Sequence, residues 1–333
     1  MIPLDTPFFP NSVLTKKRLS ECIDSAWVGY QGKYAQQLQK LLCDLYQTKF
    51  CIPVSSGSHA MYMALASLDL PAGSEVIVPT ECYSGNVIAI TMNNCKPKFI
   101  DSVPHAPNTD VKNILDAITS KTKAVLIPHM YGQVIDLTKL KSKKIFIIED
   151  TALTLRASRN SVADIICTSF HNKIITAGEG GAVMLNNSAL YKKLCKLWVP
   201  SQNNRDDTLF LSGRLNNLSC AVAVSQLEVL EQIVQKRNKV AKTYNRLLNQ
   251  NTHYDVCWRY QYKCENPKKL IEHLRKNGVE SRQVFEPMHY RFTKKKFPNA
   301  QEWSSKHIDL PSGPALSKKD INYVCNIIQK YEA

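Results

Sequence analysis

The sequence lacks the features that would place it in a membrane, outside the cell or around a metal ion. No run among its 333 residues approaches the roughly 18 consecutive apolar residues of a membrane-spanning helix. The N-terminal segment MIPLDTPFFP has neither the basic lead nor the apolar stretch of a secretory signal. The eleven cysteines form no C-x-x-C pair and no Cys/His spacing typical of a zinc site. We therefore expect a cytoplasmic protein with reduced thiols, no bound metal and no membrane association.

The chain is strongly basic, with 43 Lys and Arg against 28 Asp and Glu, a net charge of +15. Much of the excess lies in 236–296, including the KKK run at 294–296. No DNA- or RNA-binding motif accompanies these residues, and aromatic residues do not alternate with them. A solvated basic face is therefore favoured over a nucleic-acid groove. Attraction of an anionic small substrate is a third explanation.

Seven short apolar runs alternate with helical patterns between residues 50 and 186. Helical spacing is seen, for example, in MYMALASL (61–68) and TDVKNILDAI (109–118). This order is typical of βαβ units, so we predict an α/β fold whose mainly parallel, seven-stranded sheet is covered by helices. Ligands of such sheets bind beyond the carboxyl ends of the strands. The runs lie at 50–54, 75–79, 96–101, 124–128, 144–150, 164–170 and 180–186.

The pattern changes after residue 215. Residues 216–249 contain neither Pro nor Gly, and their Leu and Val residues recur at intervals of three and four residues. This spacing predicts one long helix that links two domains. We predict an N-terminal arm and large domain over 1–215, and a smaller α+β domain over 250–333. The latter ends in an amphipathic helix that begins with the capping-box pair Ser317 and Asp320.

A serine-rich turn, SSGS, follows the first predicted strand and precedes a helix. The first amides of a helix have no acceptor within it, and the helix dipole favours an anion there. Ser56, Gly57, Ser58 and the amide of His59 could therefore bind a phosphate. A plain serine N-cap is the alternative.

Asp150 ends an apolar strand at the edge of the predicted sheet. A buried carboxylate there needs a cationic or donor partner. The protonated ring nitrogen of pyridoxal phosphate is such a partner. The alternative is a carboxylate that caps a loop.

Lys173 lies near the same edge, in SFHNKIITAGEGG (169–181). A phosphate-binding P-loop is excluded because the glycines follow the lysine. The apolar flanks are compatible with burial, which would lower the lysine pKa as a Schiff-base lysine requires. Tyr83, after the strand at 75–79, could stack on a planar cofactor. A solvated lysine and a packed tyrosine are the alternatives.

Taken in order, these motifs resemble the DegT-like nucleotide-sugar aminotransferases of fold type I, and the perosamine-synthase branch most closely. The resemblance covers nearly the whole chain. Besides the motifs above, SAWVGYQGKY (25–34), PHMYGQ (128–133) and GVESRQVFEPMH (278–289) follow in family order. Members of that branch aminate C4 of a nucleotide-linked 4-keto-6-deoxyhexose. The resemblance thus implies a pyridoxal-phosphate enzyme that uses a nucleotide sugar and glutamate, works as a homodimer and binds no nucleic acid.

The resemblance also implies roles for individual residues. Lys173 would hold the cofactor as a Schiff base and transfer the proton, and Asp150 would pair with the ring nitrogen. Tyr83 would stack on the ring. The phosphate would be held by Gly57, Ser58, His59 and Ser169, and by Ser212 of a second subunit. The substrate would be contacted by His129, Tyr131, Arg214 and His289.

The chain departs from the family pattern in four places. Ser169 lies four residues before Lys173, where five is usual, and Leu153 replaces the usual Gln or His. Ser212 stands where a neighbouring subunit usually supplies Asn. The connections 151–168 and 198–213 are short. Two alternative functions therefore stay open. One is a sugar dehydratase, a relative in which His replaces the lysine, and His171 lies close by. The other is a non-catalytic homologue that binds a sugar nucleotide.

Overall fold

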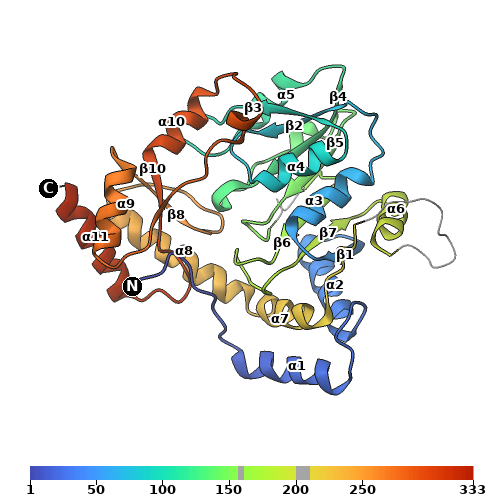
Figure 1. Cartoon of the computed structure of the whole chain (residues 1–333), viewed down its shortest axis with the longest axis horizontal. Coiled ribbons are helices and arrows are strands. Elements are labelled where there is room, and N and C mark those ends of the chain that lie inside the picture. The colour runs from blue at the N-terminus through green and yellow to red at the C-terminus, as the bar shows by residue number, and fades with distance from the viewer. Residues whose placement is uncertain (157–160, 200–210, 333) are drawn as a thin grey trace.

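The computed structural model describes residues 1–156, 161–199 and 211–332. Its larger part is a seven-stranded sheet in the order β1-β7-β6-β5-β4-β2-β3 (Figure 1). Neighbours from β6 to β3 pair in parallel, whereas β7 runs antiparallel to both β6 and β1. The predicted seven-stranded, mainly parallel sheet is thus confirmed. The strands are β1 (Phe50–Val54), β2 (Glu75–Pro79), β3 (Lys96–Ile100), β4 (Thr122–Pro128), β5 (Phe146–Asp150), β6 (Ile165–Ser169) and β7 (Gly181–Leu185).

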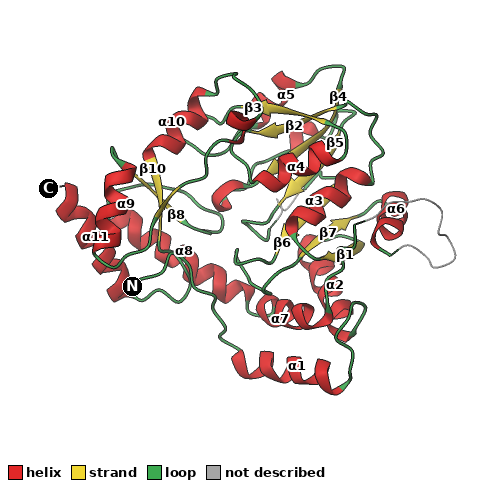
Figure 2. Cartoon of the chain, viewed as in Figure 1, coloured by secondary structure: helices red, strands yellow, loops and turns green. Residues whose placement is uncertain are grey.

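Helices cover both faces of this sheet (Figure 2). The alternation of side chains along a strand sends Val183 and Leu185 of β7 to one apolar cluster, and Ala182 and Met184 to another. The first cluster is covered by α3 (Gly57–Ala66), α4 (Ser84–Met92) and α6 (Ser188–Trp198). The second cluster is covered by α2 (Lys33–Tyr46) and α7 (Asn217–Leu227). A third cluster, on β2, β4 and β5, is covered by α5 (Val111–Ala117) and the short turn η2 (Thr138–Leu140).

A smaller unit with its own core follows. Its three-stranded antiparallel sheet has the order β8 (Tyr260–Lys263), β10 (His307–Leu310), β9 (Arg282–Gln283). Helices α8 (Leu230–Leu247), α9 (Pro267–Lys276) and α11 (Lys318–Glu332) complete its core. The chain terminus also joins it, because the Ile2 amide donates to the Gly278 carbonyl (2.8 Å). The first residues therefore pack on the small unit, although the sequence assigned them to the large domain.

The predicted long helix over 216–249 is wrong in one respect, because it is two helices. The backbone leaves helical geometry at Val229 (φ −114°, ψ 16°), between α7 and α8. Glu228, beside this break, accepts two hydrogen bonds from Arg18 of α1 (Ser12–Asp24), at 2.8 and 2.7 Å. After the break, the first half of α8 still packs in the large sheet's cluster, and its second half packs in the core of the small unit. The domain bounds at 215 and 250 stay predictions.

The two units share packing rather than a flexible linker. Trp258 and Trp303 belong to the apolar cluster of the large sheet, and Met288 and Phe297 to the cluster on its other face. These residues lie before β8, in η3 (Met288–Arg291) and in or beside α10 (Pro298–Lys306). In the described part of the chain no helix is long and apolar enough to span a bilayer.

Candidate active site

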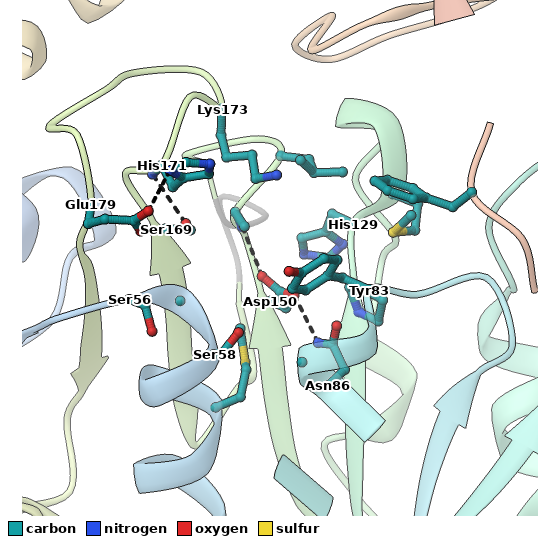
Figure 3. Close-up of a pocket in the computed structure, with 18 residues that line it drawn as sticks. Ser56, Ser58, Tyr83, Asn86, His129, Asp150, Ser169, His171, Lys173 and Glu179 are labelled. Atoms are coloured by element: carbon teal, nitrogen blue, oxygen red, sulfur yellow. Dashed lines mark hydrogen bonds and ion pairs between the residues drawn. The ribbon is translucent and has the colours of Figure 1, made fainter. Parts of the chain in front are cut away.

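A cavity of about 290 Å³ opens at the carboxyl ends of β4, β5 and β6 (Figure 3). The starts of α3 and α4, the loop between β6 and β7, and Phe285 from the small unit complete its wall. Parallel strands present their carboxyl ends at one edge, so residues far apart in the sequence meet there. Gly57, Ser58, Tyr83, Asp150, Ser169 and Lys173 all line this cavity, as do His129 and Leu153.

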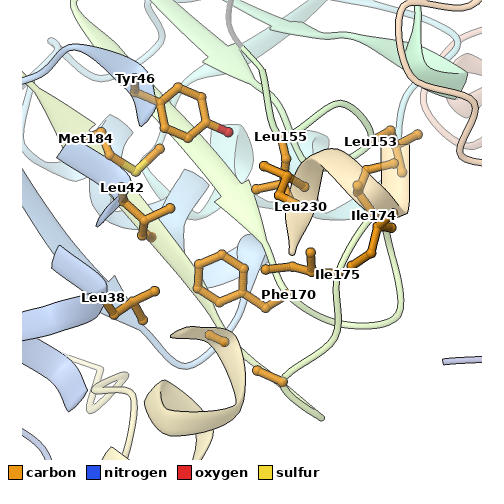
Figure 4. Close-up of a cluster of buried hydrophobic side chains, with 14 of the residues drawn as sticks. Leu38, Leu42, Tyr46, Leu153, Leu155, Phe170, Ile174, Ile175, Met184 and Leu230 are labelled. Carbon is orange, nitrogen blue, oxygen red and sulfur yellow. The ribbon is translucent and has the colours of Figure 1, made fainter. Parts of the chain in front are cut away.

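Backbone hydrogen bonds and buried side chains fix the loop that carries Lys173. The Phe170 amide donates to the Gly180 carbonyl (2.8 Å), and the Ala177 amide to the Phe170 carbonyl (2.9 Å). Ile174 and Ile175 are buried in the apolar cluster under the loop (Figure 4). Burial of these two side chains leaves the preceding lysine on the cavity side.

Lys173 is also fixed from the small unit's side. Arg237 of α8 donates to its carbonyl oxygen (2.9 Å). Its Nζ lies 5.8 Å from the ring centroid of Tyr83 and 4.8 Å from that of Trp258. The lysine is therefore placed between an aromatic ring of each unit.

Electrostatics make Lys173 an unusual lysine. Burial, assisted by the charges of Arg259 and Arg282, lowers the pKa of Lys173 to about 8, against the opposing effect of Asp150. A sizeable fraction of the side chain is consequently neutral near pH 7.5, which an amine nucleophile or base requires.

Asp150 ends β5 and is buried. It accepts hydrogen bonds from Asn86 Nδ2 (2.9 Å) and from the Ala152 amide (3.0 Å). Burial raises the pKa of this carboxyl, and the hydrogen bond from Asn86 acts in the opposite sense. The described residues place no Lys or Arg in an ion pair with it. Its carboxylate is thus available to a cationic group in the cavity.

Asn86 is a site residue that the sequence prediction missed. It lies in the first turn of α4, three residues after Tyr83, and its Oδ1 is buried without a partner among the described residues. A signal existed, because PTECYSGN places an amide on the helix that follows the same strand edge. That edge position could have identified Asn86 as the side chain that orients Asp150.

The turn before α3 packs tightly against β6. A Cβ on Gly57 would lie 2.7 Å from the Ser169 Cβ, so only glycine fits there. Ser58 and Ser169 both line the cavity beside this helix start. Ser169 lines the cavity despite the shortened spacing to Lys173, and its contact with a phosphate stays a prediction. The cluster of hydroxyls at a helix N-terminus suits an anion.

His59 does not line the cavity. Its amide donates to the Ser56 side chain (3.1 Å), which caps α3. Its ring packs against Gly213, where an added Cβ would lie 2.1 Å from Nε2. For Ser56 and His59 the structure therefore shows the alternative arrangement, in which the serine side chain caps the start of the helix.

His129 lines the cavity, but both of its ring nitrogens are engaged. Nε2 is 3.1 Å from Glu149, and Nδ1 accepts from the Ile135 amide (3.2 Å). Its ring therefore shapes the wall rather than offering a free donor.

Tyr131 and His289 are buried behind the wall of the cavity. The Tyr131 hydroxyl accepts from the Phe285 amide (3.0 Å), and His289 Nδ1 pairs with Thr80 Oγ1 at 2.5 Å. Neither side chain lines the cavity, so their substrate contacts stay a prediction that these positions do not favour.

Ser212 and Arg214 do not line the cavity of their own chain. Arg214 lies over the ring of Tyr30, at 4.3 Å from its centroid. Their contribution to a second subunit's site stays a prediction.

Two further residues mark the rim. His171 Nδ1 lies 2.9 Å from the Glu179 carboxylate and 3.0 Å from the Gly178 carbonyl. Leu153 presents an apolar side chain to the cavity, at the position where the family pattern has Gln or His. Lys173 rather than His171 stands between Tyr83 and Trp258, which disfavours the dehydratase arrangement.

The chain is similar to known aminotransferases over nearly its whole length. The model of the DegT/DnrJ/EryC1/StrS aminotransferase family matches residues 12–329. A GDP-perosamine synthase of Escherichia coli O157:H7 is 30% identical over 345 residues, covering 95% of each chain. One from Vibrio cholerae is 29% identical, covering 99% of each chain. The fold matches the solved structure of aminotransferase TlmJ from Streptoalloteichus hindustanus with a TM-score of 0.91, at 20% identity over 99% of this chain and 98% of that one.

Proposed function

Because this chain belongs to the DegT/DnrJ/EryC1/StrS aminotransferase family, we propose that it transfers the amino group of glutamate to C4 of a nucleotide-linked 4-keto-6-deoxyhexose. The product is a 4-amino-4,6-dideoxyhexose of the perosamine or viosamine type. The observation that carries the proposal is a lysine of pKa about 8 that shares one cavity with Asp150, Tyr83 and the start of α3.

The enzyme's cofactor is pyridoxal phosphate, and the residues present fit it. Asp150 offers a buried carboxylate for the protonated ring nitrogen, and Tyr83 offers a ring face at the same wall. Gly57 leaves room at the helix start that a Cβ would fill, and Ser58 and Ser169 offer hydroxyls to the phosphate. When bound, the cofactor supplies an electron sink for the carbon that carries the amino group.

The protein's own contribution is to place and move a proton. Lys173 Nζ gains or loses a proton near neutral pH because its pKa is about 8. Asn86 orients Asp150 through a hydrogen bond. The Asp150 carboxylate would then stabilise the positive charge of the cofactor's ring nitrogen. The apolar surfaces of Met61, Leu153 and Phe285 limit the access of water. Donor and acceptor use the same cavity in turn, so ping-pong kinetics are expected.

The choice of sugar rests on the relatives. Three proteins at 28–30% identity are named GDP-perosamine synthases, so GDP is the nucleotide we favour. Other relatives act on different carbons or nucleotides by their names, among them a dTDP-3-amino-3,6-dideoxygalactose transaminase at 24% identity.

A homodimer in the cytoplasm completes the proposal. Large apolar side chains are exposed on α1 and the turn after it, notably Val13, Ile23 and Trp27. We interpret these exposed apolar side chains as surface that a second subunit would cover. Light scattering should give twice the mass of the chain, and a fully active monomer would contradict the proposal.

The activity is tested with a panel of GDP-, dTDP- and UDP-linked 4-keto and 3-keto sugars plus glutamate. Mass spectrometry of the products separates amination, which replaces the keto oxygen by an amine, from dehydration, which removes water. The Lys173→Ala variant serves as the control. Absence of any cofactor absorbance after incubation of the wild type with pyridoxal phosphate would support the non-catalytic alternative instead.

A further inference from the structure

Two arginines of the small unit converge beside Lys173. Arg259 immediately precedes β8, and Arg282 begins β9. Both reach Asp309 of the intervening strand β10: Arg259 Nη1 lies 3.4 Å and Arg282 Nε 3.1 Å from its Oδ2. Asp309 is fully buried. The strand pairing, in which Asp309 stands opposite Arg282, fixes this arrangement.

Each guanidinium group lies over an aromatic ring next to the cavity, although neither arginine lines the cavity itself. The Arg259 guanidinium carbon lies 4.2 Å from the centroid of the Trp258 ring, and Lys173 Nζ lies 4.8 Å from the same centroid. The Arg282 guanidinium lies 5.0 Å from the ring of Phe285, which lines the cavity. The charges of both arginines contribute to the low pKa of Lys173, consistent with this proximity.

The pair carries more charge and more donors than Asp309 can use. One carboxylate faces two guanidinium groups, so one positive charge is left over. Arg259 Nε is buried without a partner among the described residues. Arg282 is 41% exposed at its side chain, and the part of the chain that the structure describes gives no acceptor to its two terminal nitrogens. A surplus of fixed cationic donors beside the reacting amine is suited to an anion.

We propose that Arg282, supported by Arg259, binds the α-carboxylate of the amino donor. This inference rests on the proposed transamination. In an amino acid the carboxylate and the amino group share one carbon, so the carboxylate site must adjoin Lys173. The diphosphate of a nucleotide sugar is separated from the keto carbon by the hexose ring and lies farther out. The paired N–H groups of a guanidinium match the two oxygens of a carboxylate.

The experiment follows the two half-reactions separately by the absorbance of the bound cofactor. With L-glutamate alone, Arg282→Gln should raise the half-saturating concentration about 10- to 100-fold, because a charge-assisted pair is lost. With the aminated enzyme and the keto sugar alone, the half-saturating sugar concentration should stay within about twofold of wild type, because the effect of the lost charge on the Lys173 pKa falls on the rate. Arg282→Lys should have a half-saturating L-glutamate concentration between those of wild type and Arg282→Gln. Arg275→Gln, an exposed arginine on α9 of the same unit, is the matched control for net charge and should resemble wild type.

Amide analogues identify which carboxylate is bound. Wild type should discriminate strongly against the α-amide of L-glutamate, and Arg282→Gln should lose most of that discrimination. Discrimination against L-glutamine, whose side chain carries the amide, should not change. In cofactor-free protein, glutarate should slow chemical labelling of Lys173 in wild type and in Arg275→Gln, but not in Arg282→Gln.

Two results would overturn the inference. If only the half-reaction with the sugar weakens, the pair binds the diphosphate. If neither half-reaction nor the labelling changes, the pair binds no substrate anion. Failure of the proposed function is distinguishable, because the wild type would then complete the glutamate half-reaction and aminate none of the keto sugars.

Discussion

Replacing Lys173 by Met should abolish transamination and, in cofactor-free protein, stabilise the fold near neutral pH. The folded chain holds the lysine pKa at about 8, against 10.5 for the ordinary side chain. The unfolded chain therefore binds the proton more tightly, so the lysine costs stability wherever it is protonated in the unfolded state. This cost is complete below pH 8 and disappears as the pH rises to 10.5.

The pKa difference gives the magnitude. It corresponds to a cost of about 3 kcal/mol at pH 7 and about 1 kcal/mol at pH 10. Methionine loses the cation–π contacts of Lys173 with Tyr83 and Trp258, which offsets up to about 1 kcal/mol. Lys173→Met should therefore be about 2 kcal/mol more stable than wild type at pH 7 and only about 1 kcal/mol more stable at pH 10, where the folded-state lysine is neutral and has no cation–π contact to lose.

Urea unfolding of the cofactor-free proteins at the two pH values measures this difference, since bound cofactor would add its own stabilisation. Lys139→Met, at an exposed lysine, is the control and should change stability by no more than about 0.5 kcal/mol at either pH. The reasoning fails if Lys173→Met is less stable than wild type at pH 7, or if its advantage is the same at pH 10.

The remaining predictions concern the cofactor's surroundings. Asp150→Asn should lower turnover by about 100-fold or more without loss of the fold, because it removes the charge opposite the ring nitrogen; steady-state kinetics and thermal unfolding check this. Asn86→Ala should reduce turnover less than Asp150→Asn, since it acts only through the orientation of Asp150, and an equal or larger loss in the same assay would contradict that role. Gly57→Ala should weaken cofactor binding about tenfold, measured by absorbance titration, because its Cβ would lie 2.7 Å from that of Ser169. An unchanged affinity in that titration would contradict a role of this turn in cofactor binding.

The sheet and the convergence of Lys173, Asp150 and Gly57 could be predicted because both follow from local sequence. Buried parallel strands appear as apolar runs between helical patterns, and residues that directly follow such strands meet at one edge. Little tertiary information is needed for either step.

What the sequence did not predict depends on packing between distant segments. No Pro or Gly marks the break at Val229, which coincides with contacts from α1 to the end of α7. Tyr131 belongs to a motif in family order, yet its left-handed backbone (φ 55°) and its bond to Phe285 take it out of the cavity. Arg259 and Arg282 approach Lys173 only because the small unit folds back onto the large one.

The most direct test of the proposed function uses glutamate carrying isotopically labelled nitrogen and a GDP-linked 4-keto-6-deoxyhexose. The account predicts that wild-type enzyme places the labelled nitrogen on C4 of the sugar, as read by NMR of the purified product, and that Lys173→Ala places none. A product that lacks the label, or labelled product formed by Lys173→Ala at the wild-type rate, would contradict it.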